Sequence, residues 1–307
     1  MANPAALLLI TVNVVLPVLL IASVGFIARR ALGIDPRPIT RLTLYVMIPV
    51  LLFNSLLTTK MGGDEIARIA IYAILLTAVL VAVGFGMARA LRLSRSEASG
   101  ITLSVAFVNA ANYGLPVNLF AFGQEGFDRA VIFAAFAAML TFSVALFVAA
   151  RGRLAWRQAL LPVVQIPVVW AGVAAGLIRV SGVEVPDIAQ RTIALLSQGT
   201  VPIIILLLGM QVANMNAKRL GTPAFAAIGV RLFLSPILGL GLVALLQPDP
   251  LTAKVLVLAS AMPTAVNVAL LAAEFDAEPE LVSSVVLITT ILSIATVPGW
   301  VAFLQNL

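Results

Sequence analysis

Long runs of uncharged, apolar residues follow one another along nearly the whole chain. About ten such runs are separated by charged residues or by Pro and Gly residues. The length of each run is close to the roughly 20 residues that cross a bilayer as a helix. They cover residues 6–28, 39–58, 66–89, 97–122, 127–150, 157–179, 188–213, 222–246, 251–274 and 280–304. Because lipid offers no hydrogen-bond partners, the backbone N–H and C=O groups of each run must form hydrogen bonds with one another. The pattern predicts an all-α membrane protein of about ten transmembrane helices.

The composition excludes a soluble globular domain. Hydrophobic residues make up 62% of the 307 residues and charged residues only 10%, whereas soluble domains average about 45–50% and about 25%. The chain has 19 Lys and Arg against 13 Asp and Glu. Nearly all of these charges lie in or beside short connections, where they act as orientation signals. We therefore expect contact with the lipid bilayer and no binding of nucleic acid.

The chain contains no Cys and no His. Their absence excludes disulfides, haem and iron–sulfur ligation, zinc sites built on thiolates or imidazoles, and His general bases. We expect no metal, no cofactor and no catalytic residue, so the protein is predicted not to be an enzyme.

The basic residues predict the orientation in the membrane. Twelve of them lie in or beside the connections after the odd-numbered runs, and six lie in or beside the others. The twelve are Arg29, Arg30, Arg37, Arg41, Arg89, Arg92, Arg95, Arg151, Arg153, Arg157, Lys218 and Arg219, and the six are Lys60, Arg68, Arg129, Arg179, Arg191 and Lys254. Positively charged connections stay in the cytoplasm. We expect a multi-pass protein of the bacterial inner membrane with both termini extracytoplasmic and the first run retained as a helix.

The chain also repeats itself at about half its length. Pro49 and Pro202 are separated by the same number of positions as Phe122 and Phe275. With five helices in each half, the second copy must be inserted upside down, which is the inverted-repeat plan of secondary transporters. We expect the two five-helix repeats to cover residues 1–155 and 156–307.

The fourth and ninth runs carry polar and helix-breaking residues halfway along. These residues are Asn109, Asn112, Tyr113, Gly114 and Pro116 in the fourth run, and Pro263, Val266 and Asn267 in the ninth. Pro removes a backbone donor and clashes with the preceding turn, so both helices should open there. Paired interrupted helices in two halves mark a substrate site near the midplane, where helix N-termini would attract an anion. We expect the other prolines inside runs only to kink their helices.

Several segments resemble the auxin efflux carrier family. They are Asn109 to Pro116, the stretch with Tyr45, Pro49 and Phe53, Pro263, Ala272 to Phe275, and Glu280 to Ser284. The resemblance covers nearly the whole chain and implies the inverted-repeat fold of PIN carriers and bile-acid symporters. In that fold the broken helices 4 and 9 cross, helices 1, 2, 6 and 7 form a scaffold, and helices 3, 4, 5, 8, 9 and 10 form a moving transport domain. It also implies that Asn109 contacts the substrate, and we expect a homodimer formed through the scaffold helices.

Charge placement bears on how transport would be driven. Every acidic residue falls in a connection or at a helix end, whereas proton-coupled transporters generally relay through buried carboxylates or His. We therefore expect potential-driven export of a small organic anion, auxin-like or another carboxylate, by an elevator motion. The alternatives are a sodium-coupled organic-anion symporter of the bile-acid type and, outside transport, a ligand-binding membrane receptor.

Four further residues are candidates for the substrate site. Arg231 is the one charge well inside a run, and it either compensates an anionic substrate or extends to the cytoplasmic interface. Leu52 is predicted to contact the substrate. For Asn54 and Gln211, helix packing and the substrate cavity are the two alternatives.

Overall fold

The computed structural model describes residues 8–150 and 163–306. Within these ranges every regular secondary-structure element is a helix. Seven helical stretches among them are long and apolar enough to cross a membrane. They are Leu8–Leu32, Pro36–Thr58, Gly63–Ala90, Ala110–Ala149, Asp187–Val212, Thr222–Leu246 and Pro279–Gln305. The predicted all-α, multi-pass membrane protein is thereby confirmed.

The difference from ten predicted spans has a local cause in each case. The fourth run is divided at Ala106, and its second part joins the fifth run across Gly123, a residue with φ of 67° and ψ of −165°. The ninth run is divided into two short helices, α14 (Pro250–Ser260) and α15 (Val266–Glu274). The sixth run appears as α10 (Pro167–Ser181), because its start, the predicted connection Arg151 to Arg157 and the predicted repeat boundary lie outside the described residues.

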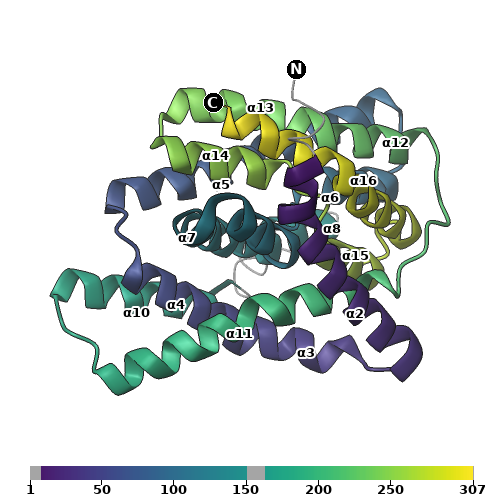
Figure 1. Cartoon of the computed structure of the whole chain (residues 1–307). Coiled ribbons are helices and arrows are strands. Elements are labelled where there is room, and N and C mark those ends of the chain that lie inside the picture. Colours follow the sequence, from purple (N-terminus) through teal and green to yellow (C-terminus); the bar gives the residue numbers. More distant parts are fainter. Residues whose placement is uncertain (1–7, 151–162, 307) are drawn as a thin grey trace.

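Two groups of helices can be distinguished in Figure 1. The lower group, here called group A, packs α2 against α11, and α4 against both α10 and α11. Its elements are η1 (Thr11–Val15), α2 (Leu16–Leu32), α3 (Pro36–Leu42), η2 (Thr43–Met47), α4 (Ile48–Thr58), α10 and α11 (Asp187–Val212). Group A contains the helices that the resemblance assigns to a scaffold.

The remaining helices form group B, which packs α5 on α6 and α7, and α14 on α7 and α13. Its elements are α5 (Gly63–Ala90), α6 (Arg95–Ala106), η3 (Ala110–Gly114), α7 (Leu115–Leu140), η4 (Thr141–Ala145), α8 (Leu146–Ala149), α12 (Thr222–Gly229), η5 (Val230–Leu234), α13 (Ser235–Leu246), α14, α15 and α16 (Pro279–Gln305). Group B therefore holds both interrupted segments.

Prolines inside the runs explain a recurring local feature. Four wide π-helical turns, η1, η2, η3 and η5, are each followed directly by an α-helix with a proline in its first turn. These prolines are Pro17, Pro49, Pro116 and Pro236. A proline lacks the N–H for the usual bond and its ring crowds the preceding turn, so the turn before it widens. Pro202, by contrast, lies inside the continuous helix α11.

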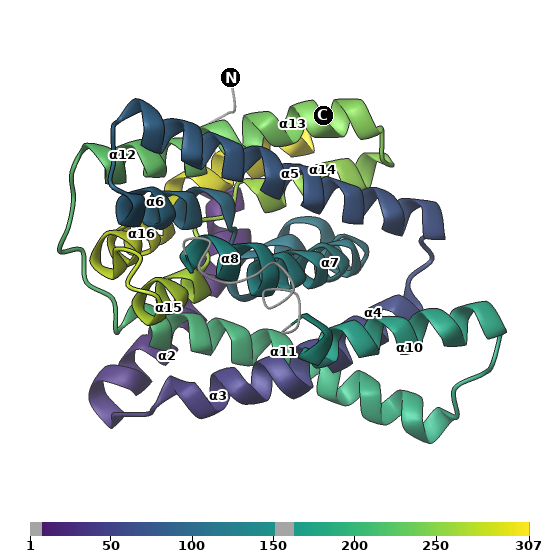
Figure 2. The ribbon, with the colours of Figure 1, turned by 180° about the vertical axis from the view of Figure 1, so that it is seen from behind.

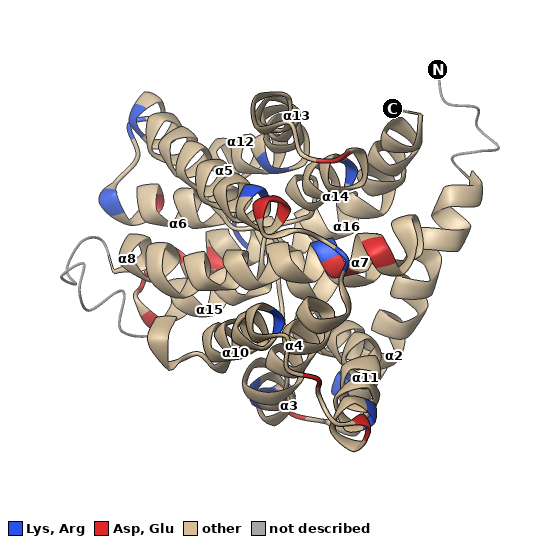
Figure 3. Ribbon diagram, turned by 90° about the vertical axis from the view of Figure 1, so that its left-hand side faces the viewer, with Lys and Arg blue, Asp and Glu red and all other residues tan. Residues whose placement is uncertain are grey.

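The connections lie on two opposite sides of the helices. In Figure 2 the links α2–α3, α5–α6, α11–α12 and α15–α16 lie on the left, and α4–α5, α10–α11 and α13–α14 lie on the right. Figure 3 shows charged residues gathered at helix ends and connections, with long uncharged stretches between them. The left-hand connections are those predicted to be cytoplasmic, and which side faces the cytoplasm stays a prediction.

Candidate functional site

The two interrupted segments predicted from the sequence lie against each other. Helix α6 ends at Ala106 and α14 ends at Ser260, and a short non-helical segment follows each. The Asn109 N–H donates to the Pro263 carbonyl at 2.8 Å, and the Ala265 N–H donates to the Phe107 carbonyl at 2.9 Å. An antiparallel bridge between Val108 and Thr264 results. Each broken helix thus supplies backbone partners for the other, as buried polar groups in a membrane require.

Side chains satisfy further backbone groups at this crossing. The Thr264 hydroxyl donates to the Ser104 carbonyl at 2.7 Å, and the Thr264 N–H donates to the Thr289 hydroxyl at 3.2 Å. Beyond the crossing the chain re-enters helix at Ala110 and at Val266. The site therefore combines two helix C-terminal ends with two helix N-terminal ends.

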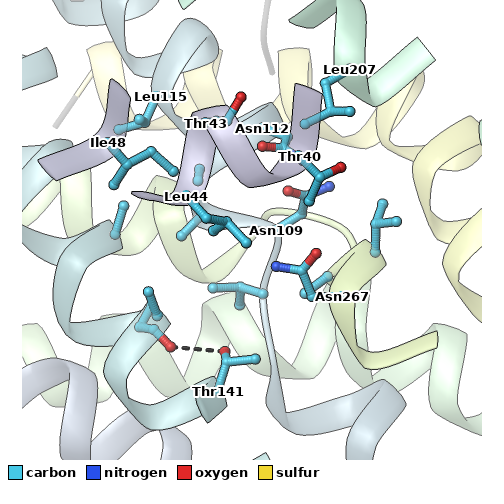
Figure 4. Close-up of a pocket in the computed structure, with 18 of the residues that line it drawn as sticks. Thr40, Thr43, Leu44, Ile48, Asn109, Asn112, Leu115, Thr141, Leu207 and Asn267 are labelled. Carbon is cyan, nitrogen blue, oxygen red and sulfur yellow. Dashed lines mark hydrogen bonds between the residues drawn. The ribbon is translucent and has the colours of Figure 1, made fainter. Parts of the chain in front are cut away.

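A cavity of about 70 Å³ lies beside the N-terminal ends. Asn109, Asn112 and Asn267 line it from group B, and Gln211 closes it from α11 of group A. In Figure 4 the amides of Asn109 and Asn267 lie close together and project into the same space. Alanines form much of the remaining wall, at positions 110, 111, 134, 137, 138 and 265. The cavity is consequently small, amide-bearing and apolar, and it lies between the two groups.

Two buried polar atoms at the cavity have no hydrogen-bond partner among the residues that the structure describes. They are Asn109 Nδ2, on a side chain that is 5% exposed, and Thr43 Oγ1, on a side chain that is 2% exposed. Buried polar groups are normally paired, and an unpaired one is costly. One of these atoms belongs to group B and the other to group A. A ligand in the cavity could accept a hydrogen bond from both.

Among the described residues, no charged side chain lines the cavity. The charge of the site comes instead from the backbone, because Asn109 and Ala265 occupy the N-cap positions of η3 and α15. The first N–H groups of a helix have no intrahelical partner, and each N-terminus carries about half a positive charge. The arrangement is suited to a small anion.

A wider vestibule of about 750 Å³ adjoins the cavity and shares Thr40, Gln211 and Val266 with it. Its charged lining residues are the basic Arg29, Arg37 and Lys218 and the acidic Asp35 and Glu280. Asp35 and Lys218 lie in the connections α2–α3 and α11–α12, and the other three lie in the helices next to the connections α2–α3 and α15–α16. All three connections are on the left in Figure 2. The vestibule thus leads from the more basic side of the molecule to the cavity.

The structure brings together five of the predicted site residues and places the others elsewhere. Asn109, Asn112, Gln211, Val266 and Asn267 line the cavity. Pro263 contributes its carbonyl to the crossing, Gly114 packs near Met262, and Pro116 lies in the first turn of α7. Tyr113 lines an apolar groove with Val18 and Phe26, Leu52 lines another with Gly172, and Asn54 is half-buried on α4 away from the cavity.

Arg231 requires a correction. Both interpretations from the sequence, compensation of a substrate charge and extension to the cytoplasmic interface, require an accessible guanidinium. The side chain is 0% exposed and does not line the cavity. It donates instead to the carbonyls of Val105 and Ser260. Arg231 therefore holds together the two helix ends at the crossing and does not face the cavity.

Two other features of the structure could not be predicted from any motif. Thr40, Thr43 and Thr141 add hydroxyls to the cavity, although none lies in a motif. Asp128 is buried near the Gly123 turn, where its Oδ1 accepts hydrogen bonds from Ser55 Oγ at 3.0 Å and Gln124 Nε2 at 2.9 Å. Its place beside a turn agrees with the predicted helix-end position, but its burial was not predicted.

Residues 10–153 and 151–301 match the family described as membrane transport protein. The chain belongs to this family. The resemblance to auxin efflux carriers is thereby confirmed, and so is the expectation that the protein is a transporter rather than an enzyme.

Three relatives show how much of the chain the similarity covers. An uncharacterized transporter of Methanothermobacter thermautotrophicus is 28% identical over 291 residues, which are 93% of this chain and 96% of the relative. A Rhizobium meliloti protein provisionally named a malonate transporter is 31% identical over 138 residues, 45% of this chain and 42% of its own. Protein PIN-LIKES 7 of Arabidopsis thaliana is 33% identical over 122 residues, 37% of this chain and 31% of its own.

Proposed function

We propose that this transporter exports a small monovalent organic anion, a monocarboxylate with an apolar body, across the cytoplasmic membrane. The observation that carries the proposal is the unpartnered Asn109 amide at an uncharged cavity between two helix N-termini. Two N-termini together supply about one positive charge. One carboxylate would match that charge, and the alanine-lined wall would contact its apolar part.

The relative provisionally named a malonate transporter supports a carboxylate substrate. Malonate carries two carboxylates, and the second would lie among apolar residues with no Lys or Arg in the cavity lining. Burying an uncompensated charge is costly. We therefore favour monocarboxylates over dicarboxylates for this chain.

We further propose an elevator motion in which group B carries the site past group A. Both N-termini and the amides of Asn109 and Asn267 belong to group B. Group A supplies the facing wall, including Thr40, Thr43 and Gln211. A displacement of group B would move the site as a unit and change which side it opens to. The basic vestibule would gather anions at the cytoplasmic side in the present conformation.

The membrane potential is sufficient to drive export in this scheme. A monovalent anion that leaves a cell with a negative interior gains about 2.3 kcal/mol per 100 mV. Within the part of the chain that the structure describes, the cavity lining contains no carboxylate or other titratable group that could exchange a proton with the substrate. We infer a uniport mechanism, with the termini outside and a scaffold formed by group A.

Transport of labelled carboxylates in proteoliposomes would test the proposal. An imposed potential should drive accumulation of a monocarboxylate such as phenylacetate more strongly than that of malonate, and a pH gradient at zero potential should not. Strict dependence on a sodium gradient would replace uniport with the symporter mechanism. Binding of the carboxylate with no transport under any gradient would favour a receptor.

A further inference from the structure

Arg231 lies where the C-terminal ends of the two interrupted helices meet. Its Nη1 donates to the carbonyl of Val105 in the last turn of α6 at 2.7 Å, and its Nη2 donates to the carbonyl of Ser260, the last residue of α14, at 2.6 Å. Nη2 also donates to Ser235 Oγ, and this hydroxyl donates to the Ser260 carbonyl at 2.8 Å. One fully buried side chain therefore closes both helix ends.

The charges at this point balance. A helix C-terminus carries about half a negative charge, so the two ends together carry about −1, which matches one guanidinium. The ion pairs found among the described residues involve Arg68, Arg129 and Arg219, and none involves Arg231. A buried charge without any compensation would be strongly unfavourable. The helix ends themselves are therefore its counter-charge.

We propose that Arg231 is a built-in cation that makes the crossing independent of any bound metal ion. Carbonyls at half-helix C-terminal ends are the groups that coordinate Na⁺ in transporters with broken helices, and here the guanidinium occupies them. Its charge cancels the negative ends, so the positive N-terminal ends act on the cavity unopposed. This second effect rests on the proposed anion transport, whereas the cation role does not.

The Arg231→Ala variant would test the cation role, because it leaves the oxygens of Val105, Ser235 and Ser260 without a positive charge. Thermal unfolding of the purified protein would be measured in choline chloride, with millimolar guanidinium, Na⁺ or urea added. We expect a lower melting temperature in choline than for the parent, raised by guanidinium or Na⁺ and unchanged by urea, which resembles guanidinium but is neutral. Arg231→Lys should remain insensitive to added cations. Ser235→Ala, which keeps the charge and loses one contact, should also be insensitive.

Transport supplies a second readout. Arg231→Ala should move the monocarboxylate at least about tenfold more slowly than the parent in choline, the loss expected when one hydrogen-bonded charge is removed, and guanidinium but not urea should restore most of the rate. The proposal is overturned if Arg231→Ala melts like the parent in choline, or if guanidinium and urea act alike. If the variant cannot be purified in choline, recovery of monodisperse protein with guanidinium alone would support the proposal, and failure with both additives would overturn it. A parent that requires Na⁺ for transport would contradict uniport, and the melting temperatures of the variants would still decide the role of Arg231.

Discussion

Asn112 Nδ2 donates a hydrogen bond to Gln211 Oε1 at 3.1 Å, and this bond joins η3 of group B to α11 of group A. Both side chains are buried at the edge of the cavity. The motif around Asn112 predicts that this residue lies at the site. For Gln211 the sequence leaves two equal alternatives, which are helix packing and the substrate cavity. Their pairing shows that polar residues of both groups meet at one point. Any movement of one group past the other would have to break this hydrogen bond.

Loss of this bond should destabilise the present arrangement of the two groups. An intramolecular hydrogen bond contributes about 0.5–1.5 kcal/mol net, so Asn112→Ala and Gln211→Ala should each lower stability, with a coupling energy of about 1 kcal/mol in a double-mutant cycle. Thermal unfolding of the four proteins measures this coupling. Asn118 is a suitable control, because its Nδ2 donates to the carbonyl of Gly114, and both residues belong to group B. Asn118→Ala combined with Gln211→Ala should be additive, and equal coupling for both pairs would contradict the prediction.

The substrate site itself is tested at Asn109. Asn109→Ala should weaken binding of the transported monocarboxylate by about 1.5–3 kcal/mol, the range for a hydrogen bond to a charged group, with loss of most transport. Asn267→Ala should act similarly, and the double variant should be less than additive because both amides contact one ligand. Isothermal titration and proteoliposome uptake would measure these effects.

Asn54→Ala is the matched control for this experiment. Asn54 is half-buried on α4 and does not line the cavity, so its loss should leave carboxylate affinity unchanged. If Asn109→Ala binds and transports like the parent while Asn54→Ala does not, the site lies on the other face of group A and the assignment to the crossing fails.

The sequence predicted the local breaks better than the long-range pairings. The breaks near Pro116 and Pro263 follow from missing N–H groups and amides inside apolar runs, which are local properties. The partner of a freed carbonyl depends instead on which helices pack together. Arg231 illustrates this limit. The apolar pattern around it could not reveal that the ends of α6 and α14 converge on its guanidinium. Thr43 was missed because a single hydroxyl in an apolar run carries no pattern.

The predicted orientation can be tested with single cysteines, because the chain has none of its own. Ala217 is exposed between α11 and α12, and Asn306 is exposed after α16. Asn306→Cys should react with an impermeant thiol reagent in intact cells, whereas Ala217→Cys should react only after lysis, because basic connections stay inside. The reverse pattern would show that the protein is inserted the other way round.

The contact between α2 and α11 depends on two glycines. A Cβ at Gly209 would lie 1.8 Å from the Ala22 carbonyl oxygen, and one at Gly25 would lie 2.0 Å from the Leu206 carbonyl oxygen. These neighbours are backbone atoms, which cannot rotate away, so Gly209→Ala should force the helices apart. We expect it to destabilise the protein by about 1–3 kcal/mol or more, the range for overpacking, as measured by thermal unfolding.

Gly241→Ala provides the control for this contact, since a Cβ at Gly241 in α13 meets nothing within 4 Å. It should leave stability unchanged or raise it by about 0.5–1 kcal/mol, the usual gain from Gly to Ala inside a helix. Gly25→Ala together with Gly209→Ala should cost less than the sum of the two single changes, because once the helices have separated the second methyl group meets less resistance. A Gly209→Ala protein that unfolds at the same temperature as the parent would show that α2 and α11 do not approach each other this closely, and group A would then need a different packing.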